Sequence, residues 1–319
     1  MQAAAAAPLL VVLTGPTGSG KSHFALQLVE RLAGRVPIEI VSVDSAQVYR
    51  GMDIGTAKPE RAIRQRVPHH LIDIRDPTEV YSAGEFVHEA GALITAIHSR
   101  GALPLLVGGT MLYLRALRDG LAALPPASSV IRREIDAEAA VHGWAAMHQQ
   151  LCRIDPHAAA RIAPQDAQRI QRALEVHRLT GVALSHWQDR TPDMRASYHW
   201  LRYALWPDSR AGLRMRLEAR FAAMMRAGLL DEVQCLYARG DLTAELPSMR
   251  AVGYRQLWQY CANQLSLEAA STAAVNATAQ LAKRQLTWLR RDREITALRS
   301  EVVGISERVA ADILAALGA

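Results

Sequence analysis

The chain has 319 residues, 50% of them hydrophobic, and carries a formal net charge of +6 with a pI near 9.5. This length allows one large or two medium domains with an ample core. No apolar run approaches the ~20 residues of a membrane span, and residues 1–8 lack the basic start of a signal peptide. The three cysteines are scattered, which argues against a disulfide framework or zinc site and for a reducing compartment. We therefore expect a cytoplasmic protein without a membrane segment.

The most distinctive motif near the start of the chain is a phosphate-binding loop. A buried strand, predicted over residues 9–13, runs into GPTGSGKS at Gly15–Ser22, which fits G-x-x-x-x-G-K-[ST] at every fixed position. Apolar residues at helical spacing over 23–32 complete the order strand, loop, helix. In such a loop, backbone N–H groups converge on phosphate oxygens, and the helix N-terminus adds positive potential. The motif predicts polyphosphate binding, and it does not by itself predict phosphoryl transfer.

Individual side chains of this loop have separate expected roles. Lys21 supplies a point charge for the terminal phosphate, and the Ser22 hydroxyl is the predicted ligand of a Mg²⁺ ion. The residues expected to bind the diphosphate are Gly15, Thr17, Gly18, Ser19, Gly20, Lys21 and Ser22.

Two further strands are predicted to end beside the loop. Residues 38–43 are followed by Asp44, and residues 103–107 are followed by Gly-Gly and then Thr110. In an open α/β sheet, ligands bind outside the carboxyl ends of the strands. Asp44 is therefore a candidate base or metal ligand, with a turn-capping Asp as the alternative, and Thr110 offers a hydroxyl. The third strand lacks the acidic end that nucleotide hydrolases usually have, so a motor ATPase is disfavoured.

The middle of the chain has the pattern of an all-helical insertion. From residue 128 to about 195, capping residues and apolar spacing predict helices, and strand character resumes at 198–205. We therefore predict the α/β class: a P-loop NTPase-like parallel sheet flanked by helices, with a helical insertion domain. The predicted parts are the first part of the catalytic core at 1–121, the insertion at 122–196, and the rest of the core with the C-terminal helices at 197–319.

Two of the later helices carry basic residues on one side. The helix predicted over 210–227 is expected to expose Arg214, Arg216 and Arg220. The last long helix, predicted over about 267–293, places Arg284, Trp288 and Arg291 on one face. That face fits contact with a nucleic-acid backbone, and a solvated basic face with a half-buried Trp explains it equally well.

Seven motifs follow one another along nearly the whole chain. They are GPTGSGKS (15–22), SVDSAQVYRGMDIGTAKP (42–59), PHHLID (68–73), LVGGTMLYLRAL (106–117), DAQRIQRALEVHRLTG (166–181), AVGYRQ (251–256) and AKRQLTWLRR (282–291). Together, and in this order, they closely resemble the bacterial tRNA dimethylallyltransferases. The resemblance implies transfer of a dimethylallyl group from dimethylallyl diphosphate to N6 of adenosine-37, which is 3′ of the anticodon. The tRNAs would be those that read codons beginning with U, and the products N6-isopentenyladenosine and diphosphate.

The resemblance also implies roles for particular residues. The expected catalytic residues are Asp44, Lys21, Thr110 and Arg220. Asp44 would act as the base, and Lys21, Arg220 and Mg²⁺ near Ser22 would stabilise the departing pyrophosphate. The expected tRNA-binding residues are Asp44, Ser45, Ala46, Gln47, Thr110, Gln168, Arg169, Ile170, Gln171, Arg172, Arg250, Gly253, Tyr254 and Arg255.

The expected partners are tRNA, through its anticodon stem-loop, and dimethylallyl diphosphate, with Mg²⁺ as the cofactor. We expect a monomer, because no coiled-coil pattern or exposed apolar helix demands a partner. Two other function classes stay open on the residues alone. One is a P-loop kinase of a small metabolite or nucleoside with Asp44 as base, and the other is an RNA-binding P-loop protein without catalytic activity.

Overall fold

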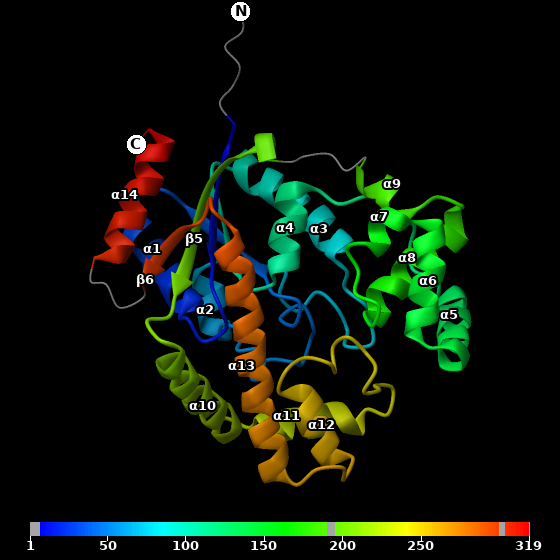
Figure 1. Ribbon diagram of the computed structural model, residues 1–319. Helices are drawn as coiled ribbons and strands as arrows, with labels where there is room; N and C mark the ends of the chain where they lie inside the picture. Colours follow the sequence, from blue (N-terminus) through cyan, green and yellow to red (C-terminus); the bar gives the residue numbers. More distant parts are fainter. Residues whose placement is uncertain (1–6, 190–194, 300–303, 319) are drawn as a thin grey trace, which may run out of the picture. The chain divides into compact units, whose positions relative to one another are not determined.

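The computed structural model describes residues 7–189, 195–299 and 304–318 (Figure 1). The chain separates into two compact units. The first unit combines Met1–Leu117 with Arg195–Ala319, and the second is Arg118–Met194. The insertion that the sequence predicts at 122–196 corresponds to this second unit, which starts four residues earlier and ends two residues earlier.

The first unit is built on a six-stranded parallel sheet with the strand order β3-β2-β4-β1-β5-β6. The strands are β1 (Leu9–Thr14), β2 (Ile38–Val43), β3 (His69–His70), β4 (Leu103–Gly108), β5 (His199–Trp206) and β6 (Thr296–Arg299). This sheet confirms the predicted α/β class. The sequence analysis identified β1, β2, β4 and β5, and it missed the two short edge strands β3 and β6.

Both faces of this sheet are covered by helices, as Figure 1 shows. Leu9, Val11 and Leu13 of β1 pack in one core with α1 (Lys21–Leu32) and α14 (Ile305–Leu317). Leu10 and Val12 point the other way and pack with α3 (Ala83–Ser99) and α4 (Met111–Asp119). Burial on both faces explains why β1 reads as a continuous apolar run rather than an alternating one.

The remaining helices of the first unit surround the carboxyl end of the sheet. They are α10 (Arg210–Arg226), α11 (Leu229–Ala238), α12 (Tyr254–Cys261) and α13 (Leu267–Arg291), whereas α2 (Arg61–Arg66) precedes β3 and a 3₁₀ turn at Arg195–Ser197 precedes the amino end of β5. The long helix α13 packs against both α10 and α12, and Ser266 caps its first turn. Its apolar stripe contributes Ala282, Leu286 and Leu289 to the cores between these elements.

The described residues of the second unit form helices and no strand, as predicted. These helices are α5 (Ser129–His142), α6 (Trp144–Ile154), α7 (Pro156–Ala159), α8 (Ala167–Thr180) and α9 (Leu184–Asp189). The Asp166 side chain accepts a hydrogen bond from the backbone N–H of Arg169 at the start of α8. Gly181 ends the same helix with a φ of 69°, a left-handed conformation that favours glycine.

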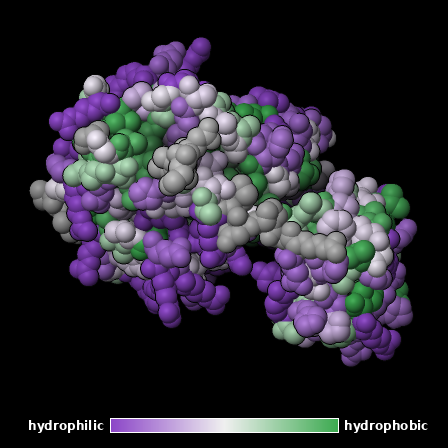
Figure 2. Space-filling model, turned by 90° about the horizontal axis from the view of Figure 1, so that it is seen from above, coloured by the Kyte–Doolittle hydropathy of each residue, from purple (hydrophilic) through white to green (hydrophobic). Residues whose placement is uncertain are grey.

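Within the described ranges, no helix combines the length and the apolar character that a membrane span requires. The face in Figure 2 carries mainly hydrophilic residues, which surround smaller groups of hydrophobic ones.

Candidate active site

The carboxyl ends of three neighbouring strands meet in register. Thr14 at the end of β1 pairs with Gly108 at the end of β4, and Gly108 lies opposite Val43 at the end of β2. A Cβ added to Gly108 would lie 2.1 Å from the carbonyl oxygen of Val43, so glycine is needed for this close approach. The segments that follow these strands therefore start together: the phosphate loop after β1, Asp44 after β2, and Gly109 with Thr110 after β4.

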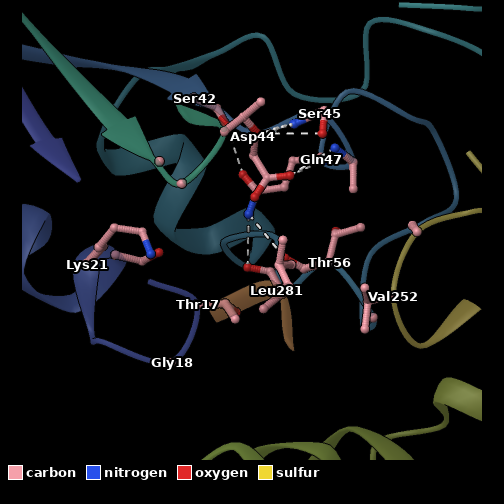
Figure 3. A pocket seen from close by; sticks show the side chains of 18 of the residues that line it. Thr17, Gly18, Lys21, Ser42, Asp44, Ser45, Gln47, Thr56, Val252 and Leu281 are labelled. Atoms are coloured by element: carbon pink, nitrogen blue, oxygen red, sulfur yellow. Dashed lines mark hydrogen bonds between the residues drawn. The ribbon is translucent and has the colours of Figure 1, made fainter. Parts of the chain in front are cut away.

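These segments line a cavity of about 790 Å³ in the first unit. Its wall also includes parts of α10, the loop before α12, and α13. All four residues expected to be catalytic, Lys21, Asp44, Thr110 and Arg220, contribute to this wall. Figure 3 shows Lys21 and Gly18 of the phosphate loop, Asp44 and Gln47 of the segment after β2, and Leu281 of α13 around the same space.

The phosphate loop has the conformation that its glycines predict. Gly18 and Gly20 have φ angles of 77° and 87°, a region that other residues adopt only with strain. No side chain caps the first turn of α1. Its first backbone N–H groups therefore stay available as hydrogen-bond donors, which makes a helix N-terminus an anion site. The Ser19 hydroxyl is buried and has no hydrogen-bond partner among the described residues. The loop thus carries several donors that oxygen atoms of a phosphate would satisfy.

Two cations face a carboxylate across this cavity. Burial lowers the pKa of the Lys21 ammonium to about 8, although the nearby Asp44 carboxylate raises it; the Arg220 guanidinium lowers it further. Burial also lowers the pKa of Arg220, and Asp44 opposes that shift. The Lys21 ammonium donates a hydrogen bond of 2.8 Å to the carbonyl oxygen of Pro16. An anionic ligand would favour the charged form of both cations.

The position of Arg220 differs from one sequence expectation. The helical pattern of α10 predicts that Arg214, Arg216 and Arg220 share an exposed side. In the structure, Arg220 lines the cavity, whereas Arg214 pairs with Glu218 on α10 at 2.6 Å. Arg220 therefore has the location that its expected role requires, for a reason that helix periodicity alone does not reveal: α10 is flanked on that side by the cavity rather than by bulk solvent.

Asp44 combines the two interpretations that the sequence left open. Its Oδ1 atom accepts hydrogen bonds from the backbone N–H groups of Ala46 at 2.9 Å and Gln47 at 3.3 Å, which caps the turn after β2. Within the described chain, its hydrogen bonds all go to Oδ1. The same residue lines the cavity and interacts electrostatically with Lys21. A carboxylate held by one oxygen can still use the other in chemistry.

Gln47 is held by its own loop. Its side-chain oxygen accepts a hydrogen bond from the Ser42 hydroxyl at 2.9 Å. Its side-chain nitrogen donates to the carbonyl oxygens of Thr56 at 3.2 Å and Ala57 at 3.4 Å, as the dashed lines in Figure 3 show. The amide therefore shapes the wall of the cavity, and the expectation that Gln47 also positions an adenine stays a prediction.

Glu232 is a structural anchor of the site that the sequence analysis missed. Its carboxylate accepts hydrogen bonds from the backbone N–H groups of Asp53, Ile54 and Gly55, at 2.9, 2.8 and 3.2 Å. The Tyr254 hydroxyl also donates to it, and the Tyr254 side chain is fully buried. Tyr254 was expected to bind tRNA; in the structure its side chain holds this loop, and burial raises its pKa.

Gln285 on α13 is a second residue that the sequence analysis left without a role. Its side-chain oxygen accepts a hydrogen bond from the backbone N–H of Thr17, and its side-chain nitrogen donates to the carbonyl oxygen of Gly109, both at 2.8 Å. The sequence did contain a signal for this role: Gln285 is a polar residue on the otherwise apolar stripe of α13. This bond uses the backbone N–H of Thr17. The expected contact between Thr17 and the diphosphate would therefore be made by the Thr17 hydroxyl.

The residues of α8 that were expected to bind tRNA divide into exposed and internal ones. Gln168 and Arg169 are exposed. Ile170 is fully buried in the core of the second unit, so its side chain serves packing there, and its expected contact with tRNA stays a prediction. Gln171 donates to Asp136 at 2.6 Å, and Arg172 pairs with the buried Glu175 at 2.7 Å.

The corresponding residues before and within α12 also divide into two groups. Arg250 and Arg255 are exposed, and Arg250 lines the cavity. Gly253 is buried and has a φ of 93° at the start of α12, so its role there is conformational. Exposed basic side chains remain candidates for phosphate contacts.

The oxygen donors of the cavity fit a magnesium ion that takes most of its ligands from a bound diphosphate and water. Ser22 is exposed in the first turn of α1 and lines the cavity together with Asp44. Over the described ranges, no group of three or more His, Cys, Asp or Glu side chains could hold a metal ion. Mg²⁺ commonly takes one or two protein oxygens, with phosphate and water oxygens completing its shell. The donor set fits an ion that arrives with a bound diphosphate.

Comparisons with known proteins find relatives that match nearly the whole chain. A family model described as IPP transferase matches residues 47–292. The tRNA dimethylallyltransferase of Methylococcus capsulatus is 53% identical over 314 residues, which cover 98% of this chain and 99% of the relative. The tRNA dimethylallyltransferase of Halorhodospira halophila is 55% identical, over 89% of this chain and 90% of its own.

Solved structures resemble the whole chain as well. The full-length tRNA isopentenylpyrophosphate transferase from Bacillus halodurans has a TM-score of 0.70 and 37% identity, and the match covers 97% of each chain. A eukaryotic dimethylallyltransferase, crystallised in snapshots of its action on tRNA, has a TM-score of 0.81 and 25% identity. That match covers 97% of this chain and 80% of the eukaryotic one.

Proposed function

Because the chain belongs to the IPP transferase family, we propose that it transfers a dimethylallyl group from dimethylallyl diphosphate to N6 of adenosine-37 in tRNA. One observation carries this proposal beyond the names of the relatives. A single cavity is lined by the phosphate loop after β1, which includes Lys21, by the Asp44 carboxylate after β2, and by the Arg220 guanidinium of α10. Those are the groups that a prenyl transfer to an amine requires.

The donor half of the cavity would hold the diphosphate. The phosphate loop, Lys21 and Arg220 would contact a group whose negative charge grows as the carbon–oxygen bond breaks. Charge that is already in place for the leaving group is commonly the largest contribution to catalysis. In this proposal the phosphate loop binds a pyrophosphate that leaves, rather than a phosphoryl group that is transferred.

The acceptor half would hold the adenine. The N6 nitrogen forms a bond to C1 of the dimethylallyl group, the bond from C1 to the diphosphate oxygen breaks, and the electron pair of that bond leaves with the pyrophosphate. The N6 proton then passes to Asp44. An exocyclic amine becomes acidic only as its bond to carbon forms, so an ionised carboxylate within hydrogen-bond reach is a sufficient base.

Positioning of the adenine would depend on Thr110, Ser45 and Gln47. A base inside an ordered anticodon loop has to be extruded before any group can reach N6. The exposed side chains Gln168, Arg169, Arg250 and Arg255 are the candidates for contacts to the anticodon stem-loop. Arginine suits such contacts because its planar guanidinium matches phosphate and stacks on bases.

A Mg²⁺ ion would neutralise part of the charge on the diphosphate, and the Ser22 hydroxyl would be its protein ligand. The chain's own groups would still orient the donor and accept the proton. We further infer that the protein is cytoplasmic, which the three free cysteines, Cys152, Cys235 and Cys261, support, and that it is a monomer.

The experiment that tests this function compares two labelled donors. Purified protein, Mg²⁺ and tRNA are incubated either with dimethylallyl diphosphate labelled in its carbon chain or with ATP labelled at the γ-phosphate. We expect label in the tRNA only from the first donor. Label that appears in a product only from ATP would support a kinase, and tRNA binding without label from either donor would support an RNA-binding protein without catalytic activity.

A further inference from the structure

Gln285 joins two segments of the cavity that lie far apart in the sequence. The bond from Thr17 N–H spans 268 residues along the chain, and the bond to the Gly109 carbonyl oxygen spans 176. Gln285 is buried, with 8% of the residue exposed. We propose that Gln285 is a positioning residue that sets the spacing between the diphosphate-binding loop and the acceptor-binding segments. This inference rests on the proposed prenyl transfer.

The chemistry of an amide fits this position because the two bonds have opposite polarity. One end of the side chain must accept from an N–H group, and the other must donate to a carbonyl oxygen. A glutamate could keep the bond from Thr17, but its second oxygen would face the carbonyl oxygen of Gly109. A leucine of similar size would leave both backbone groups without their partner, which is costly in a buried place.

The acceptor side of this link leads directly to Asp44. Gly109 precedes Thr110, whose N–H donates to the carbonyl oxygen of Val43 at 3.1 Å. The Thr110 hydroxyl accepts from the N–H of Ser45 at 3.1 Å. A displacement of the Gly109 peptide therefore moves the two segments that hold the acceptor together.

The donor side of the link leads to the phosphate loop. Thr17 lies inside the loop, and its N–H is held by Gln285 rather than by a bond within the loop. The Gly109 segment and the phosphate loop also lie close to each other, because a Cβ on Gly109 would be 3.4 Å from the carbonyl oxygen of Gly15. The Gln285 side chain thus bonds to both halves. Since a misplacement of about 1 Å can cost about 10²-fold in rate, this spacing matters for transfer.

The absence of a side chain at position 109 supports the same assignment. A Cβ on Gly109 would lie 2.5 Å from the side-chain nitrogen of Gln285. The φ angle of Gly109 is outside the left-handed region, so alanine would be accepted by the backbone itself. A methyl group at position 109 would therefore displace the Gln285 amide from its present place, and the effects of changes at the two positions should be coupled.

The test uses Gln285→Glu, Gln285→Leu and the matched control Gln280→Glu, which changes an exposed residue of the same helix. For each purified protein we would measure the single-turnover transfer rate, the Kd for tRNA, the Kd for inorganic pyrophosphate and the thermal midpoint. Both Gln285 variants should transfer the prenyl group about 10²-fold more slowly than the wild type. Their pyrophosphate binding should be weaker, with tRNA affinity within about twofold of the wild type.

The control separates positioning from a general loss of structure. Gln280→Glu should match the wild type in every measurement. A wild-type transfer rate and wild-type pyrophosphate affinity in both Gln285 variants would overturn the inference. Equal losses of pyrophosphate affinity, tRNA affinity and thermal midpoint would overturn it too, because they would indicate a merely structural residue.

A double-substitution experiment keeps the inference testable if one variant is poorly folded. Gly109→Ala should be slow because its methyl group displaces the Gln285 side chain. Gly109→Ala combined with Gln285→Ala should be no slower than Gln285→Ala alone. Losses that multiply would overturn the proposed contact. Pyrophosphate binding reports on Gln285 even if the wild type transfers no prenyl group, so failure of the proposed function is distinguishable from failure of this inference.

Discussion

The backbone N–H of Ser45 donates a hydrogen bond of 3.1 Å to the side-chain hydroxyl of Thr110. This bond ties the segment after β2 to the segment after β4, 65 residues further along the chain. It also holds the peptide that follows Asp44 at the edge of the cavity. The predictions below test the roles of the groups that this edge brings together.

Replacement of Asp44 by asparagine should abolish turnover with little effect on tRNA affinity. An asparagine oxygen can still accept the turn-capping bonds from Ala46 and Gln47, whereas the amide cannot take a proton from N6. The measurements are the single-turnover rate and the Kd for tRNA. Equal losses of both would show that Asp44 serves only as a cap.

Removal of the Arg220 guanidinium should slow transfer by about 10²-fold or more, because a buried cation would no longer stabilise the leaving pyrophosphate. The measurement is the transfer rate of Arg220→Ala at saturating donor. Arg214→Ala is the matched control, since Arg214 lies on the same helix and pairs with Glu218. An unchanged rate in Arg220→Ala would remove this residue from the site.

The affinity for dimethylallyl diphosphate should fall as the pH rises through about 8, where the Lys21 ammonium of the free protein loses its proton. A bound anion favours the charged form and raises this pKa. Affinity should therefore decline by up to about tenfold per pH unit above that point. Below that point Lys21 is already protonated, so its titration should add no pH dependence to the affinity. Calorimetric titrations across this range measure the effect. A Lys21→Met variant that shows the same decline would contradict the assignment.

Chelation of divalent metal should strongly reduce transfer, and added Mg²⁺ should restore it. Ser22→Ala should raise the Mg²⁺ concentration needed for half-maximal rate, because the ion would lose its proposed protein ligand. His23→Ala changes the neighbouring exposed residue and should leave this concentration unchanged. Identical Mg²⁺ dependence in the Ser22 variant and the wild type would exclude Ser22 as a ligand.

Replacement of Glu232 by glutamine should destabilise the first unit by about 1–3 kcal/mol. The side chain would lose one of the two acceptor oxygens that hold the N–H groups of Asp53, Ile54 and Gly55. Denaturant unfolding measures the change. Glu245→Gln, at an exposed position, should unfold like the wild type. A Glu232 variant as stable as this control would show that the loop does not depend on the carboxylate.

The sequence was most informative where the chemistry is local. The phosphate loop, the strands that precede Asp44 and Thr110, and the ends of α8 each depend on residues within one short segment. The short edge strand β6 was missed, because four residues of weak pattern do not reveal a strand that pairs with β5 alone among the described strands. β1, in contrast, was easy to recognise, because burial on both faces of the sheet makes it a continuous apolar run.

Residues that act over long sequence separations were the ones that could not be assigned. Glu232 looks like an acidic residue in the first turn of α11, yet the three backbone N–H groups that it accepts from lie 177 to 179 residues away. Arg220 looks exposed on a helical wheel and lines the cavity. Ile170 belongs to a motif of the family and serves the core of the second unit. In each case the deciding neighbour comes from another part of the chain.

The central claim is that this cavity holds a diphosphate that departs after its carbon group has moved to an adenine. Nucleoside analysis by mass spectrometry tests it most directly, with tRNA digested after incubation with protein, Mg²⁺ and dimethylallyl diphosphate. We predict one new nucleoside with the mass of N6-isopentenyladenosine, formed by the wild type and lost with Asp44→Asn. An unmodified digest from active, tRNA-binding protein, or a phosphorylated product that depends on ATP, would contradict the account.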